Sequence, residues 1–232
     1  INDWAGIDGD LRDPHRAGRT FVAKALTRSQ VGAFAMLLLF LALAITVGLG
    51  MAPFAMAVAI AGLSVLYSAP RIHLKGRPGL SSTMHLLGGA LHFLLGYVAF
   101  APVSLQAAVA SSVFGLVFTA GHFTHEARDH EGDARNGIRT NAVAMGRSRG
   151  LIAGFVCFSV AYALLFMFAI TGTLSRTLLI AGPLYLIHAV AFARVLHRGL
   201  TFRRLRRLQT IYRILFAVIG LAMALGAVRT WL

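Results

Sequence analysis

The chain alternates between long apolar blocks and short charged connections. The blocks are about twenty residues long, and those at 31–50 and 151–171 contain almost no polar positions. A soluble helix of that length would carry a polar face, whereas about 20 apolar residues are what a helix needs to cross a bilayer. The pattern therefore predicts an all-α integral membrane protein. Its seven predicted spans are 31–50, 52–68, 82–101, 103–122, 151–171, 177–197 and 211–231.

Composition supports this fold class. The 232 residues are 57% hydrophobic and only 13% charged, which excludes a disordered or fibrous chain. Each span must be a helix, because hydrocarbon offers no partner to an unpaired backbone group. We interpret 1–232 as a single transmembrane domain. The single cysteine, Cys157, excludes an internal disulfide and is expected simply to pack.

The basic residues are confined to one end of the predicted helices. The net charge is +14, and 20 of the 22 Lys and Arg residues lie in alternate connections. This is the positive-inside pattern. It places the N-terminus in the cytoplasm and the C-terminus outside. The charge then reflects topology and attraction to anionic lipid rather than nucleic-acid binding. The basic connections are 12–28, 71–77, 128–149 and 194–213, and the two exceptions are Arg176 and Arg229.

All eight acidic residues lie in two short windows, 3–13 and 126–133, on the same predicted side of the membrane. Acids scattered for solubility would also occur in the other connections. The distribution therefore indicates one site built from two segments. The acids are Asp3, Asp8, Asp10, Asp13, Glu126, Asp129, Glu131 and Asp133.

The spacing of these acids favours a divalent cation. Asp129 and Asp133 are four apart, and Asp3 and Asp10 seven apart, so each pair shares a helical face. Like charges so placed repel, and carboxylates together with substrate phosphates are typical ligands of Mg²⁺. The interspersed arginines suit phosphate groups. They are Arg128, Arg135 and Arg139.

Three motifs resemble the UbiA-type intramembrane prenyltransferases. "NDWAGIDGD" is similar to the family's N-D-x-x-D-x-x-x-D and supplies Asn2, Asp3 and Asp10. "DHEGDARNGIRT" is similar to D-x-x-x-D-x-x-x-G-x-[RK]-[ST]. Between them, "YSAPRIHLK" resembles Y-S-x-P-x-x-x-L-K. The second motif supplies Asp129, Asp133, Gly137, Arg139 and Thr140, and the third supplies Tyr67, Pro70, Arg71 and Lys75.

The resemblance implies an enzyme of nine helices, of which this chain is expected to lack the first two. It implies a Mg²⁺-dependent transfer of a prenyl group from a polyprenyl diphosphate to a small, for example aromatic, acceptor through an allylic cation. Asn2 and the acids Asp3, Asp10, Asp129 and Asp133 would be catalytic, and those four acids would hold the metal. We expect the site on the cytoplasmic side of a bacterial plasma membrane.

Other residues receive roles in binding substrate. The diphosphate is expected to contact Arg71, Lys75, Arg128 and Arg139. The substrate pocket is expected to include Tyr67, His85, His92 and His122. His85 and His92 share a helical face, and intramembrane ionisable groups are often functional; the alternative is a bond to a neighbouring helix. His188 is expected to be structural.

The chain departs from the family pattern in two places. The middle aspartate of the first motif is replaced by Gly6, with Asp8 two positions away. A further acid two turns before Asp129 is replaced by His122, near His125 and Glu126. Both changes call the usual metal stoichiometry into question.

Three alternatives remain at this point. A homologue that keeps the fold but has weak or no activity would explain Gly6. A CDP-alcohol phosphotransferase would also be helical and Mg²⁺-dependent, although its D-G-x-x-A-R motif is only echoed in "EGDAR". A desaturase would need more histidine boxes than "HFTHEARDH" provides, and a cation transporter would need acids at the middle of the bilayer.

Overall fold

A computed structural model describes residues 2–14, 16–69 and 71–229, with side chains up to residue 226. Pro70 of the third motif lies outside the described residues. Over these ranges the chain is helical, with no strand. The α-helices are α1 (Asn2–Arg12), α2 (Arg28–Leu49), α3 (Met51–Ser68), α4 (Leu80–Val98), α5 (Leu105–Arg135), α6 (Asn141–Met145), α7 (Arg147–Ile170), α8 (Ala181–Arg198) and α9 (Phe202–Arg229). Short 3₁₀ turns occupy Ala17–Arg19, Val22–Lys24, Leu74–Gly76 and Arg176–Ile180.

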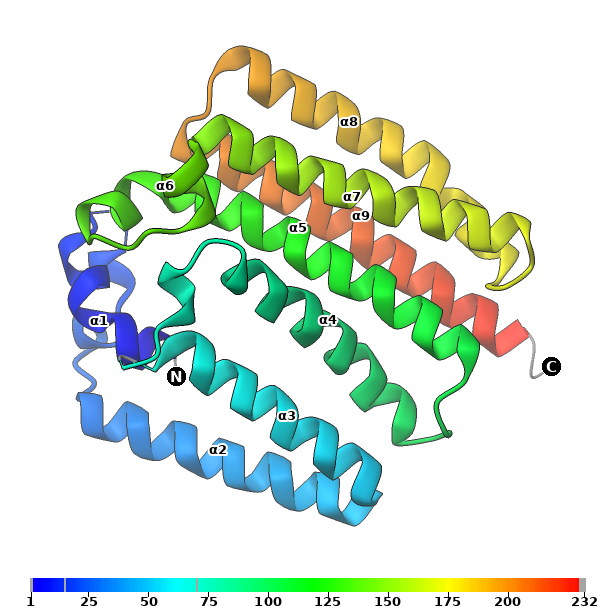
Figure 1. Cartoon of the computed structure of the whole chain (residues 1–232), viewed down its shortest axis with the longest axis horizontal. Coiled ribbons are helices and arrows are strands. Elements are labelled where there is room, and N and C mark those ends of the chain that lie inside the picture. Colours follow the sequence, from blue (N-terminus) through cyan, green and yellow to red (C-terminus); the bar gives the residue numbers. More distant parts are fainter. Residues whose placement is uncertain (1, 15, 70, 230–232) are drawn as a thin grey trace.

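Six helices among the described residues are long and apolar enough to cross a membrane, which confirms the all-α membrane fold. The remaining predicted span, 82–101, forms α4 but does not meet that criterion. Its polar residues, which include His85 and His92, lower the hydropathy. Figure 1 shows α4 lying between α3 and α5 within the bundle. The six are Arg28–Leu49, Met51–Ser68, Leu105–Arg135, Arg147–Ile170, Arg176–Arg198 and Phe202–Gly226.

Helix starts follow local sequence signals. Thr27 and Gln30 form a capping box at the start of α2, which satisfies backbone groups that the first turn leaves free. Ser104 accepts a hydrogen bond from the Ala107 amide at the start of α5. Gly50, with φ of 121°, joins α2 to α3 in a backbone conformation that favours glycine.

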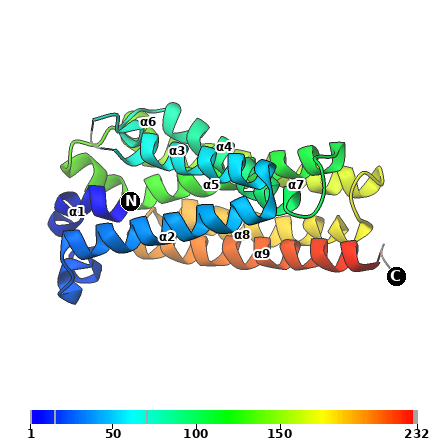
Figure 2. The same ribbon diagram turned by 90° about the horizontal axis from the view of Figure 1, so that it is seen from below.

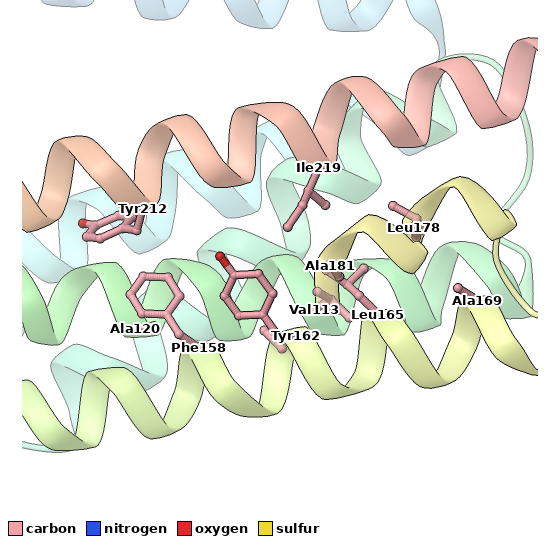
Figure 3. Close-up of a cluster of buried hydrophobic side chains, with 11 residues drawn as sticks. Val113, Ala120, Phe158, Tyr162, Leu165, Ala169, Leu178, Ala181, Tyr212 and Ile219 are labelled. Carbon is pink, nitrogen blue, oxygen red and sulfur yellow. The ribbon is translucent and has the colours of Figure 1, made fainter. Parts of the chain in front are cut away.

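The core lies where α5, α7 and α9 pack together. Figure 3 shows Phe158 and Tyr162 of α7 directed toward α5 and α9, with Tyr212 and Ile219 on α9. Small residues allow the helices to approach closely, as is usual in membranes. A Cβ added to Gly154 would lie 2.9 Å from the carbonyl oxygen of Ala120. Phe158, His188 and Phe155 form ring contacts, which fits the structural role predicted for His188.

The charged connections gather at one end of the bundle. Figures 1 and 2 both place α1, α6 and the start of α9 at that end, with the final turns of α9 at the other. The helices run antiparallel, so alternate connections fall on the same side. All the acids and 20 of the 22 basic residues therefore lie in this half of the molecule. That this end faces the cytoplasm remains a prediction of the positive-inside rule.

Candidate active site

The two acidic windows meet between α1 and the last turns of α5. Buried Ile7 anchors α1, and the Asn136 side-chain amide donates a hydrogen bond to the Gly9 carbonyl at 3.3 Å. Gly132 makes the contact close, because a Cβ there would lie 2.7 Å from Oδ2 of Asp13. The helix α5 continues far beyond its predicted span, through Arg135. The second motif is therefore held on a rigid helix rather than a loop.

Arg16 joins the two windows electrostatically. Its Nη1 lies 2.8 Å from Oδ1 of Asp10 and its Nε lies 3.7 Å from Oδ2 of Asp13. Its Nη2 pairs with Asp129 of α5. Burial alone would lower the pKa of Arg16, but the charges of Asp129 and Asp10 outweigh burial and raise the pKa above its ordinary value. The guanidinium is therefore a permanent positive charge between the two acid clusters.

Asp129 is also held from the opposite side. Arg128 donates to both its carboxylate oxygens, from Nε at 2.6 Å and Nη2 at 2.7 Å. The remaining Nη1 of Arg128 donates to Oε1 of Gln209 on α9 at 2.7 Å. Gln209 is only 2% exposed. A two-pronged contact of this kind fixes orientation as well as distance, so α9 helps to position the acid.

A first cavity, the diphosphate chamber, has a volume of about 220 Å³ and lies between these acids and the loop after α3. That loop contributes Lys75 and His73. Burial and the charge of Lys75 lower the pKa of His73, so positive charge from this loop comes from the lysine. The polar side chains that line the chamber are Asn2, Asp10, Asp13, Arg16, Ser68, His73, Lys75, Asp129, Asp133 and Asn136.

A second cavity, the apolar groove, has a volume of about 890 Å³ and is bounded chiefly by α2, α3 and α4. Its walls are mostly aliphatic, including Leu39, Leu43, Ala61 and Leu95. Tyr67 and the two predicted pocket histidines also line it. They are His85 and His92.

A third cavity, the inner chamber, has a volume of about 790 Å³ and extends between α5 and α9. It shares Lys75, Asp129 and Asp133 with the diphosphate chamber. It shares three aromatic residues with the apolar groove, and Asn2 lines all three cavities. The cavities thus converge beside α1. The shared aromatic residues are Tyr67, His85 and Phe118.

Rings cluster where the groove meets the inner chamber. His85 stacks on His122 with ring centroids 3.8 Å apart, and the edge of Tyr67 meets His85 at 5.0 Å. His122 Nε2 lies 2.9 Å from Oε1 of Glu126. The same glutamate accepts from Asn141 Nδ2 at 2.9 Å, so the start of α6 fixes it. Both His85 and His92 contact carbonyls of their own helix, through Nδ1, rather than a neighbouring helix.

Comparison with known proteins decides the family. The model of the UbiA prenyltransferase family matches residues 1–216. The chain belongs to the UbiA prenyltransferase family. No curated protein sequence matches it significantly. Among solved structures, a UbiA homologue from Archaeoglobus fulgidus bound to GPP and Mg²⁺ has a TM-score of 0.71 at 16% identity, over 96% of this chain and 81% of that one. The same homologue bound to DMAPP and Mg²⁺ gives 0.71 at 16%, over 97% and 81%.

A structure of digeranylgeranylglyceryl phosphate synthase in membranes is also similar, with a TM-score of 0.69 at 17% identity over 98% of this chain and 79% of that one. At these identities the likeness establishes the UbiA fold. The substrates and metals of those proteins bear on this chain only through its own residues.

The structure gathers most of the residues predicted from the UbiA motifs. It places Asn2, Asp10, Asp129, Asp133 and Lys75 around one chamber. Arg128 lines the inner chamber and grips Asp129. Tyr67, His85, His92 and His122 line the groove or the inner chamber.

Three predicted residues are not brought to the site. Asp3, Arg71 and Arg139 are exposed, and none of them lines any of the three cavities. Asp3 shares a helical face with Asp10 only approximately, since seven residues span slightly less than two full turns. The roles of these three residues rest on the motif resemblance alone.

Four further residues belong to the site but were not predicted to. Asp13 and Arg16 extend the face of Asp10 by successive steps of three residues, a spacing that the sequence does show. Asn141 and Gln209 carry no such signal, because their partners Glu126 and Arg128 lie on other helices.

The acids of the diphosphate chamber suit Mg²⁺ by their chemistry. Among the residues that the structure describes, no three His, Cys, Asp or Glu side chains converge on one point. Mg²⁺ usually takes only one or two carboxylates and completes its shell with waters and phosphates. Asp129 and Asp133 of α5 and Asp10 of α1 line one chamber and fit that mode.

Proposed function

We propose that the chain is a Mg²⁺-dependent membrane prenyltransferase that transfers a prenyl group from a polyprenyl diphosphate to a small acceptor. The observation that carries the proposal is the convergence of three cavities of different chemistry: a charged chamber, an apolar groove and a mixed inner chamber. A diphosphate, an isoprenoid tail and an acceptor need those three environments. Membership of the UbiA prenyltransferase family and the GPP and DMAPP bound to similar structures support it.

The donor's diphosphate would lie in the diphosphate chamber. Lys75 and Arg16 supply positive charge there, and such charge favours departure of the diphosphate by stabilising the anion as it forms. Bound Mg²⁺, held by Asp129, Asp133 and Asp10, would add charge stabilisation of the same kind. The allylic C–O bond breaks, and its electron pair leaves with the diphosphate.

The resulting allylic cation would lie where the groove meets the inner chamber. The faces of aromatic rings attract cations, and Tyr67, His85 and Phe118 lie at that junction. The acceptor's nucleophile forms the new bond to the allylic carbon and releases its proton. His85 and His122 are the candidate proton acceptors, because His122 is fixed by Glu126 and His85 stacks on it.

The apolar groove would hold the isoprenoid tail. Its walls come from α2 and α3, which expose most of their apolar side chains; in a membrane those side chains face lipid. A tail of several isoprene units can therefore enter sideways from the bilayer. We expect membrane lipids as further partners, with the basic segment 198–207 contacting anionic headgroups.

One observation favours a second candidate, a UbiA homologue with weak or no activity. Gly6 lines the diphosphate chamber where the family motif has an aspartate. A Cβ at Gly6 would meet nothing within 4 Å, so aspartate fits there. If Gly6→Asp raises activity, the chain is a weakened enzyme; if both forms are inactive, the second candidate is favoured.

The test is Mg²⁺-dependent release of pyrophosphate from polyprenyl diphosphates of several lengths, measured in membranes that contain the chain. Asp133→Ala is the negative control, and the exposed Asp8→Ala, outside all three cavities, is the matched control. We expect release that requires both Mg²⁺ and Asp133. Absence of release at every length from well-folded protein would contradict the proposal, and a strict preference for short donors would contradict sideways entry of the tail.

A further inference from the structure

The wall of the inner chamber on α9 carries a cation that the reaction outlined above does not use. Arg213 lines this chamber, and its Nη2 lies 3.0 Å from Nε2 of His125 on α5. At 1.5 Å per residue it lies about 16 Å along α9 beyond Phe202. It is therefore well inside a helix that is apolar enough to span the membrane, and it is directed at α5 rather than back toward the charged end.

The other arginines of this chamber are compensated, whereas Arg213 is not. Arg16 and Arg128 both pair with Asp129, and Lys75 faces the acids of the diphosphate chamber. Among the residues described by the structure, Arg213 forms no ion pair with an acid; its recorded partner is the His125 ring. A guanidinium stays charged at any physiological pH, and an uncompensated charge within a membrane is costly. An anion at this position would remove that cost.

The rest of the chamber indicates what kind of molecule carries the anion. Between Arg213 and the junction with the groove, the wall is formed by Val117, Phe118, Tyr212 and Phe216. These side chains suit a compact apolar or aromatic body. Arginine pairs with carboxylate and phosphate oxygens in a two-pronged geometry. A molecule with its anion at Arg213 would direct its opposite end toward Tyr67 and His85.

We propose that the inner chamber binds an anionic acceptor, a compact molecule bearing a carboxylate or phosphate monoester that pairs with Arg213 beside His125. This inference rests on the proposed function, because it names the class of acceptor for that reaction. Arg213 touches the substrate through its anionic group and sets specificity, while the reacting atoms lie at the far end of the chamber.

The test measures binding of two matched probe pairs to the purified chain in phosphatidylcholine nanodiscs. The pairs are benzoate with benzamide and phenyl phosphate with phenol, and pyrophosphate with Mg²⁺ is present to fill the diphosphate chamber. We expect each anion to bind about tenfold or more tightly than its neutral partner, the ratio that a hydrogen bond to a charged group supports. Arg213→Gln should abolish that ratio and leave benzamide binding unchanged.

Matched variants separate this effect from general damage. Arg213→Lys should retain part of the preference, and Arg206→Gln, on the same helix but outside the three cavities, should retain all of it. Equal loss in Arg213→Gln and Arg206→Gln, or no preference in the unaltered chain, would overturn the proposal. If the preference is absent in phosphatidylcholine and Arg213→Gln changes only the retention of phosphatidylglycerol, the anion is a lipid headgroup and the acceptor assignment is wrong.

The proposed function can fail separately. Binding of pyrophosphate with Mg²⁺, without any acceptor probe, reports on the diphosphate chamber alone. Lys75→Gln should weaken that binding and leave the benzoate preference intact, whereas Arg213→Gln should do the reverse. Pyrophosphate binding that is absent from all forms would count against the prenyltransferase, while the probe pairs still read the inner chamber.

Discussion

The two sides of the bundle are built in opposite ways. On the side of α5, α7 and α9, buried residues recur along each helix and glycines bring the backbones together. On the side of α2 and α3, the described residues include few buried ones, and a large groove separates these helices from α4. The acids are therefore placed by the tightly packed side, and the tail is received by the loosely packed one. Precision is needed where charge is handled, and space where a flexible chain is bound.

The largest effect is expected at the charged end of the tight side. Asp129→Ala would leave the paired cations Arg16 and Arg128 without their acid. Loss of one partner of a buried ion pair costs about 3–5 kcal/mol, so the unfolding free energy should fall by an amount in that range and activity should disappear. Chemical denaturation in detergent and pyrophosphate release measure the two effects. Asp8→Ala, whose nearest cation Arg28 is 3.8 Å away, should change neither.

The close packing itself can be broken with one residue. Gly154→Leu would force a side chain against the backbone of α5, since even a Cβ would lie 2.9 Å from the Ala120 carbonyl. Overpacking of this kind costs roughly 1–3 kcal/mol. The thermal unfolding midpoint should therefore fall. Gly62→Leu on α3, where a Cβ would meet nothing within 4 Å, is the matched control from the loose side. Equal shifts in both variants would show that the two sides do not differ.

A smaller effect is expected from the residue that positions Arg128. Gln209→Leu removes the oxygen that accepts from Arg128 Nη1. Hydrogen bonds to charged groups contribute about 1.5–3 kcal/mol, so kcat should fall roughly tenfold or more while donor KM changes little. Gln209→Glu keeps an oxygen acceptor and should restore most of the rate. A rate unchanged in Gln209→Leu would show that α9 does not position the acid.

The smallest effect on stability is expected in the groove. Ala61→Phe would place a ring in open space between α2 and α3; surface and cavity-facing changes without clashes usually stay within about 0.5 kcal/mol. The preferred donor should become shorter, which competition between polyprenyl diphosphates of different length would measure. Val58→Phe, exposed and outside the groove, should leave the preference unchanged. An unaltered preference in Ala61→Phe would contradict the assignment of the groove to the tail.

The sequence allowed the membrane fold and much of the site to be predicted. The apolar blocks indicated six helices that the structure confirms as long and apolar enough to span. The spacing of Asp129 and Asp133 placed them correctly on one helical face. It failed for the details that depend on other helices: Asp3 is exposed, and Arg71 and Arg139 line none of the cavities.

Hydropathy and spacing are local properties, so the sequence by itself determined the helices, the charged end and the two acidic windows. Only the tertiary structure decided which charges meet. Arg16 and its partner Asp129 are 113 residues apart, and their pairing requires α1, α5 and the intervening loop to lie in one register. The same register joins a charged chamber, an apolar groove and an inner chamber. Such convergence arises from the relative positions of packed helices, which a one-dimensional pattern does not contain.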